Sequence, residues 1–200
     1  MKRIEINNSI YPSFIGNWYL ENPNLCKQLI NFFDSSSSKQ IQGVSERGAD
    51  LNKKKRIDIK IYPNDLKNEK NLLLKNYIKE LHNCYLDYLT QWPFLKGVAK
   101  EVHIGPFNMG KYEIGDHFGV THSERTSQST LHRLFAFMTY LNNVESGGET
   151  YFNHYKIKIK PEEGKTLIWP AEWTHAHSGT IVKKGKKYII TGHLHFPIRN

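Results

Sequence analysis

The second half of the chain, from about residue 99, consists of short apolar or alternating runs separated by Gly, Asn and Pro residues that favour turns. Short strands at this spacing are typical of a small sandwich or barrel, and they argue against a parallel α/β sheet, in which helices alternate with strands. Eight candidate strands follow one another, at residues 100–104, 107–113, 132–141, 149–152, 155–159, 165–169, 174–181 and 187–196.

The first half reads as mixed helix and strand. Asn22 followed by Pro23 predicts the start of a helix that ends at the serine run 35–38. Residues 57–61 alternate between isoleucine and charged residues, which predicts a strand with one buried face. Residues 65–89 keep a helical period of apolar residues and predict the longest helix.

Composition indicates one folded domain. The chain has 200 residues with 38% hydrophobic and 12% aromatic residues, which is enough to bury a core and excludes a disordered chain. We expect a single domain, 1–200, in which 1–98 supply helical and β support with a lid, and 99–200 form the strand-rich core. Two cysteines make no disulfide framework, and no apolar run approaches the roughly 20 residues of a membrane span, so a cytoplasmic protein is expected, in the host cytoplasm if viral.

The net charge is +9, with two local basic runs at residues 53–56 and 183–187. Neither run is interleaved with aromatic residues as in proteins that bind single strands, so nucleic acid is not an expected partner. These lysines are expected to lie in solvated loops, and the charge leaves binding of small anions open.

The pair His122-x-Glu124 is followed 53 residues later by His177, and Lys187 lies ten residues beyond it. Two imidazoles and one carboxylate can occupy one side of a metal ion and leave the other side open, which suits non-haem Fe(II) that also binds a co-substrate and O2. A cation at a fixed distance from the last ligand indicates that the co-substrate is an anion.

Further residues surround these positions in a fixed order: Tyr112-Glu113-Ile114-Gly115, Phe118, Arg133, Tyr140-Leu141-Asn142, Gly147-Gly148-Glu149-Thr150, Gly164, Trp169-Pro170, His177-Ser178-Gly179 and Lys187-Tyr188. This order resembles the prolyl 4-hydroxylase-like branch of the Fe(II)/2-oxoglutarate dioxygenases, including its small bacterial and phage members. The resemblance covers about residues 112–196. It implies a double-stranded β-helix, or jelly-roll, with N-terminal helices packed on the major sheet: a mainly β fold of the α+β class.

The resemblance implies a role for each site residue. The metal ligands, which are also the catalytic residues, would be His122, Glu124 and His177, with Glu124 where most members have Asp. Residues assigned to 2-oxoglutarate would be Lys187, which meets its distal carboxylate, with Tyr140, Tyr112 and Thr191. Further pocket candidates are His193, which stands where the family has Trp, with His175 and Arg133.

Two assignments have close rivals. Strand alternation places Lys187, Thr191 and His193 on one face and Lys186 on the other, which favours Lys187 as the anion-binding cation. His175 lies two residues before His177 and would share its face in a regular strand. The ten-residue separation in the sequence between His177 and Lys187 favours His177 as the ligand.

The implied reaction is hydroxylation of a C–H bond of a prolyl peptide or protein, or of an amino-acid-like substrate, with release of succinate and CO2. It would require Fe(II), 2-oxoglutarate and O2, with ascorbate as a candidate reductant. Residues 39–56 and 125–129 are polar and are predicted to form the lid. Trp169, Trp173 and Tyr151 either line an aromatic groove for a peptide or pack at the rim.

Two other classes remain open. One is a catalytically inactive jelly-roll that binds a partner through its basic loops. The other is a zinc protein built from the histidine-rich set, although no standard zinc spacing occurs in it: His154, His175, His177, His193 and His195. The oligomeric state is left open.

Overall fold

The computed structural model describes residues 2–3, 12–44, 50–68 and 71–197. In this part of the chain the helices are α1 Leu25–Ser35, α2 Leu72–Gln91 and α3 Leu95–Val98. The strands are β1 Lys2–Arg3, β2 Gly16–Tyr19, β3 Ile41–Gln42, β4 Lys54–Lys55, β5 Ile57–Ile61, β6 His103–Ile104, β7 Phe107–Tyr112, β8 His117–His122, β9 Arg133–Tyr140, β10 Ser146–Gly147, β11 Thr150–Phe152, β12 Ile157–Ile159, β13 Lys165–Pro170, β14 His177–Gly179, β15 Val182–Lys184 and β16 Lys187–His195.

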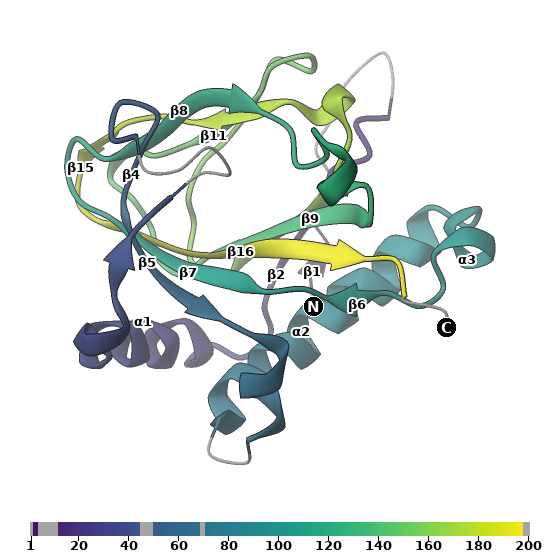
Figure 1. Ribbon diagram of the computed structural model, residues 1–200, viewed down its shortest axis with the longest axis horizontal. Helices are drawn as coiled ribbons and strands as arrows, with labels where there is room; N and C mark the ends of the chain where they lie inside the picture. The colour runs from purple at the N-terminus through teal and green to yellow at the C-terminus, as the bar shows by residue number, and fades with distance from the viewer. Residues whose placement is uncertain (1, 4–11, 45–49, 69–70, 198–200) are drawn as a thin grey trace.

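Two antiparallel sheets face each other. Among the described residues, the major sheet has nine strands in the order β1-β2-β13-β9-β16-β7-β5-β3, with β6 paired to β16. The minor sheet has the order β12-β11-β14-β8-β4, and a short β10-β15 pair lies apart from both. Figure 1 shows α1 and α2 on the outer face of the major sheet and the minor sheet on its other side. The predicted jelly-roll with helices on the major sheet is confirmed.

The major sheet buries both of its faces. Along β9, Phe135 and Phe137 pack in the core layer shared with the helices, whereas Ala136, Met138 and Tyr140 pack in the layer between the two sheets. Successive side chains of a strand point to opposite faces, so one apolar run supplies both core layers. This explains why β9 reads as a continuous apolar stretch in the sequence.

Both helices begin later than predicted. The Asn22 side chain accepts a hydrogen bond from the Asn24 amide at 3.0 Å, which makes a turn before α1, and the helix begins at Leu25. The second helix begins at Leu72 and not at 65, because residues Pro63–Lys67 form a separate 3₁₀ turn. Asp65 closes that turn by accepting the Tyr62 amide at 2.8 Å. Among the described residues, none of the helices could cross a membrane.

Each predicted strand corresponds to an observed strand, with one correction, but several observed strands were not predicted. The run 174–181 begins as a 3₁₀ turn, Trp173–His175, and becomes a strand only at His177. The longest strand that was not predicted is β8, because its sequence contains a glycine and mostly polar residues. Its side chains lie partly in solvent and partly toward a cavity, so the strand shows no apolar alternation.

Two glycine positions are required by the backbone or by packing. Gly147 and Gly148 have φ of +78° and +73°, which makes the predicted tight turn before β11. Gly192 in β16 lies against two phenyl groups, because a Cβ atom there would be 2.6 Å from Phe107 Cβ and 2.9 Å from Phe137 Cζ.

Candidate active site

His122, Glu124 and His177 converge between the two sheets. His122 ends β8 and His177 begins β14, and these residues are directly paired across the minor sheet. The Glu124 carboxylate oxygen Oε1 lies 3.6 Å from His122 Nε2 and 3.5 Å from His177 Nε2. One ligand atom from each residue falls within 4.8 Å of the other two. Strand pairing thus brings together residues that are 53 positions apart in the sequence.

Each histidine is oriented by a backbone carbonyl. His122 Nδ1 lies 2.9 Å from the Val120 carbonyl oxygen, and His177 Nδ1 lies 2.9 Å from the His175 carbonyl oxygen. A carbonyl oxygen can only accept, so Nδ1 carries the proton in both rings and the Nε2 lone pair faces the centre. Burial, followed by the neighbouring His122, lowers the pKa of His177 to about 4, so this imidazole is neutral at pH 7.

The Glu124 carboxylate is held in its ionised form. Its Oε2 accepts a hydrogen bond from His193 Nε2 at 2.7 Å. Burial opposes ionisation, but the neighbouring His122 and His193 outweigh it, and the pKa of Glu124 lies well below its ordinary value.

The three residues fit a metal ion. Ligand atoms at 2.0–2.2 Å from an ion and at tetrahedral or octahedral angles lie roughly 2.8–3.6 Å apart. The distances from the carboxylate oxygen to the two imidazole nitrogens, 3.5 and 3.6 Å, are at the upper end of that range. Two imidazoles and a carboxylate on one side, with a cavity on the other, are suited to non-haem Fe(II) with open positions.

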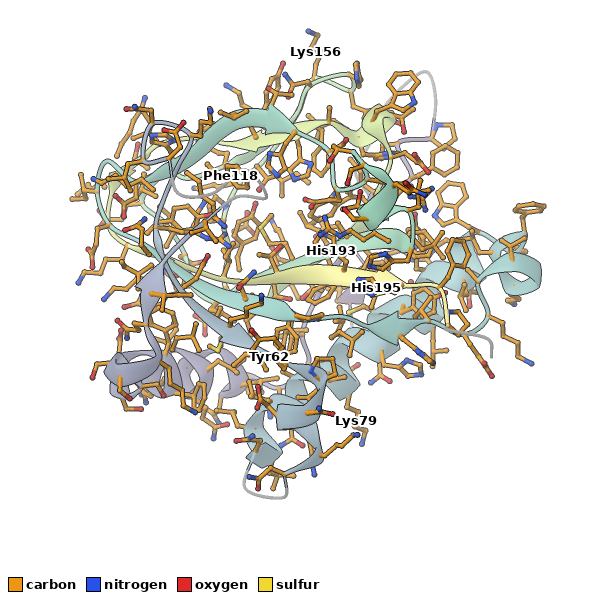
Figure 2. The ribbon with its side chains drawn as sticks, viewed as in Figure 1. Tyr62, Lys79, Phe118, Lys156, His193 and His195 are labelled. Atoms are coloured by element: carbon orange, nitrogen blue, oxygen red, sulfur yellow. The ribbon has the colours of Figure 1, made fainter. Side chains whose placement is uncertain are left out.

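A cavity of about 470 Å³ lies between the sheets beside these residues. Its volume is within the range of ligand pockets, roughly 300–1,000 Å³. Phe118 from β8 and His193 from β16 line it, and both lie between the two layers in Figure 2. Trp169 lines it from β13 and is buried, whereas Trp173 is 67% exposed, so these two tryptophans do not form one groove.

Lys187, the first residue of β16, lines the cavity. Its side chain is buried, and Nζ donates to the Gly148 carbonyl at 3.0 Å and lies 4.0 Å from the centre of the Tyr112 ring. Lys186 points away, with a 56% exposed side chain that pairs with Glu113. Burial, followed by the charge of Arg56, lowers the pKa of Lys187 to about 7.

Tyr112 stands between Lys187 and a second buried cation. Its hydroxyl accepts a hydrogen bond from Arg56 Nη1 at 2.8 Å. Burial raises the pKa of Tyr112 although Arg56 opposes the rise, so the phenol keeps its proton at pH 7. Because Arg56 donates to the oxygen, the phenol proton remains available to a ligand in the cavity.

Of the other two residues assigned to the co-substrate, Thr191 lines the cavity and Tyr140 does not. Thr191 lines the cavity and donates to the Phe137 carbonyl at 3.0 Å. Tyr140 does not belong to the cavity wall. It is fully buried, and its hydroxyl lies 2.5 Å from that of Thr150, which does line the cavity. Tyr140 therefore supports the wall through Thr150.

The rival histidine is placed elsewhere. His175 lies in the 3₁₀ turn before β14, where Nε2 donates to the Ser13 carbonyl at 2.8 Å, so the prediction that it belongs to the pocket is wrong. The turn rotates the chain between His175 and His177, which removes the shared face expected of a regular strand. Arg133 does line the cavity, and its Nη1 donates to the Glu124 backbone carbonyl at 2.8 Å.

Two buried cations were not predicted. The basic run 53–56 was expected in a solvated loop, but Lys54 and Arg56 are 6% and 3% exposed and line the cavity. Asp58, expected on the outer face of its strand, is buried between them. The signal was present in the sequence: these three positions continue the two-residue alternation of β5 back through the basic run.

The two predicted lid segments contain ordered structure. Residues 45–49 lie outside the described part, but the rest of 39–56 contributes β3 to the major sheet and β4 to the minor sheet. In the segment 125–129, the Arg125 side chain bonds to Glu172 and to the Arg133 carbonyl. Of the histidine-rich set proposed for zinc, only His177 joins the metal-binding cluster that the described residues form.

Comparisons with known proteins agree with this geometry. A sequence model of the 2OG-Fe(II) oxygenase superfamily matches residues 107–195, which include every ligand described above and Lys187. This part of the chain is similar to that superfamily. It is 29% identical over 115 residues to the probable prolyl 4-hydroxylase 9 of Arabidopsis thaliana and 26% identical over 111 residues to prolyl 4-hydroxylase 13. These matches cover 44% and 42% of this chain and span 40% of the length of each relative.

Solved structures share the fold of most of this chain. The viral collagen prolyl hydroxylase of Paramecium bursaria Chlorella virus-1, in its 2OG complex, superposes with a TM-score of 0.66 at 18% identity, covering 92% of this chain and 97% of that one. A Pseudomonas putida prolyl-4-hydroxylase gives 0.68 at 13% identity, covering 93% and 94%. A Trichoplax adhaerens prolyl hydroxylase, in complex with a peptide of hypoxia inducible factor, gives 0.66 at 18% identity, covering 92% and 84%.

Proposed function

We propose that this protein is an Fe(II)- and 2-oxoglutarate-dependent dioxygenase that hydroxylates a C–H bond of a prolyl peptide or an amino-acid-like substrate and releases succinate and CO2. The observation that carries the proposal is one cavity lined both by the three residues that could hold a metal ion and by the buried Lys187. The names of the Arabidopsis relatives support a prolyl substrate.

The protein's part in the reaction follows from its own groups. His122, Glu124 and His177 would hold Fe(II), which with 2-oxoglutarate supplies the oxidising chemistry for C–H hydroxylation by O2. His193 keeps the Glu124 carboxylate oriented through its 2.7 Å hydrogen bond. The walls contributed by Trp169, Phe118 and the two sheets exclude water from the reacting centre.

Lys187 and Tyr112 would hold the distal carboxylate of 2-oxoglutarate. A carboxylate can be buried only where a cation and hydrogen-bond donors meet it. The ammonium group provides the charge, and the Tyr112 hydroxyl provides a proton, since Arg56 already donates to its oxygen. Binding of the anion would in turn favour the protonated form of Lys187, whose pKa in the free cavity is about 7.

Anaerobic addition of Fe(II) and 2-oxoglutarate to the metal-free protein tests this function. A visible metal-to-ligand charge-transfer band is expected, and it should be lost in His122→Ala and His177→Ala. The exposed His154 provides a matched control, because His154→Ala should keep the band. A wild-type protein without the band would refute the proposal.

The co-substrate site has its own test. Lys187→Ala should keep Fe(II) but bind 2-oxoglutarate roughly 10- to 100-fold more weakly, which is the loss expected for a hydrogen-bonded charge. Lys186→Ala should bind it normally, since its side chain lies outside the cavity. Succinate release measured with candidate peptides and amino acids then identifies the substrate.

A further inference from the structure

The cavity contains a second cationic group, Lys54 and Arg56, of which the proposed chemistry uses only Arg56, as a donor to the Tyr112 hydroxyl. Lys54 Nζ donates to the Val44 carbonyl at 2.7 Å and lies 3.3 Å from Asp58 Oδ2. Arg56 Nε lies 2.6 Å from the other oxygen of the same carboxylate. One aspartate therefore serves two buried cations, and the group of three keeps one net positive charge.

The cavity wall as a whole also carries an excess of positive charge. The described lining residues include five cations, Lys53, Lys54, Arg56, Arg133 and Lys187, and a single acid, the metal-binding Glu124. Lys53 is paired with Asp50 at the surface, and Lys187 is assigned to the co-substrate. A buried charge without a full counter-charge is costly, so a site of this kind is stabilised when an anion enters it.

Lys54 is next to the metal-binding residues. In the pairing of β4 with β8 it lies opposite Phe118, and its Nζ is 5.4 Å from the centre of that ring. The Phe118 ring stacks on His122, with centroids 4.0 Å apart and planes at 21°. The ammonium group is thus separated from the first metal ligand by one aromatic ring, on the β8 side of the cavity, whereas Lys187 packs on Tyr112 of the major sheet.

We infer that the primary substrate carries a carboxylate that binds Lys54, and that Lys54 with the Arg56–Asp58 pair forms a second anion subsite separate from Lys187. The inference rests on the proposed function, because it names the substrate class of the same cavity. A single net positive charge matches a carboxylate better than a phosphate dianion. The carboxylate could be that of a small molecule, a peptide C-terminus or an acidic side chain, which share one chemistry.

Binding of matched neutral and anionic compounds tests the inference. The protein is loaded anaerobically with Fe(II) and 2-oxoglutarate, and binding is followed by calorimetry and by the change in the absorption band. The pairs are N-acetyl-L-proline and its carboxamide, a short proline peptide with a free and an amidated C-terminus, and the amidated peptide with Glu or Gln beside proline. In at least one pair the anionic member should bind roughly 10- to 100-fold more tightly.

Variants of β4 assign the preference to Lys54. Lys54→Gln, or Lys54→Met should the first not fold, is expected to abolish it, because each removes the charge. The matched control is Lys55→Gln: Lys55 is the next residue of β4, with a 49% exposed side chain paired to Asp116, and its loss should leave the preference intact. If Lys54 had only a structural role, its replacement would lower Tm and weaken the binding of both members of a pair equally.

Several results would overturn the inference. No anionic preference in any pair, a preference that survives loss of the Lys54 charge, or a 2-oxoglutarate affinity that falls in Lys54→Gln as far as in Lys187→Ala would each do so. Each of these results leaves the wild-type charge-transfer band present and the proposed function standing. Absence of that band would refute the proposed function, and this inference with it.

Discussion

Replacing Lys187 with methionine tests whether the buried ammonium group costs the folded protein stability. Methionine keeps an unbranched side chain of similar length but carries no charge. In the folded protein the pKa of Lys187 falls from 10.5 to about 7, mainly through burial. At about 1.4 kcal/mol per pH unit, this fall corresponds to a cost of roughly 5 kcal/mol for the protonated lysine.

The net gain in the variant should be smaller. The ammonium group lies 4.0 Å from the centre of the Tyr112 ring, and loss of a desolvated cation–π contact costs about 2 kcal/mol. Lys187→Met should therefore increase the free energy of unfolding of the metal-free protein by about 3 kcal/mol at neutral pH or below. The variant should at the same time lose 2-oxoglutarate binding, as expected where a site trades stability for function.

The pH dependence supplies the decisive measurement. Between pH 7 and 10.5 the unfolded lysine holds a proton that the folded lysine has released, so wild-type stability rises with pH in this window. Urea unfolding at about pH 6.5 and about pH 9 should show the wild type gaining roughly 2–3 kcal/mol relative to Lys187→Met. Lys186→Met, whose side chain is 56% exposed, should follow the wild type. Equal pH dependence in wild type and Lys187→Met would refute the reasoning.

Three further predictions concern the site and the core. His193→Leu should weaken Fe(II) binding roughly 10-fold or more, because His193 orients the Glu124 carboxylate, which would be a metal ligand. The control His195→Leu should leave Fe(II) binding unchanged. Competition with a chelator measures both affinities, and equal effects would contradict the role of His193. The Kd for 2-oxoglutarate should rise roughly tenfold per pH unit above pH 7, where Lys187 loses its proton, and calorimetry showing a flat profile would argue against it. Gly192→Ala should cost about 1–3 kcal/mol in urea unfolding, because its Cβ would lie 2.6 Å from a neighbouring side-chain carbon, whereas Gly97→Ala, with open space around it, should not be destabilising.

The sequence predicted the parts of the fold and site that depend on local periodicity or on spacing. The short apolar runs of the second half predict a small sandwich or barrel, and the family resemblance implies the jelly-roll. The two-residue period of β16 places Lys187 inside and Lys186 outside. The spacing of His122, Glu124 and His177 predicts a cluster that the strand pairing then assembles.

The features that were not predicted depend on the three-dimensional surroundings of each residue, which the local sequence does not show. β8 has a cavity on one side and solvent on the other, so its sequence lacks the apolar signal of a strand. Lys54 and Arg56 read as surface residues, because nothing local shows that Asp58 will neutralise part of their charge in the interior. The separation of His175 from His177 depends on a 3₁₀ turn that propensity alone does not reveal.

Each metal-binding histidine takes its orientation from a carbonyl two residues earlier in its own segment, His122 from Val120 and His177 from His175. The polypeptide can therefore set the ring directions before any ion arrives, unlike small zinc domains, in which metal binding supplies the folding energy. Folding and metal loading become separate events. Under the proposed function, a cell short of iron would accumulate folded, metal-free protein, and a chelator should abolish activity without unfolding the protein.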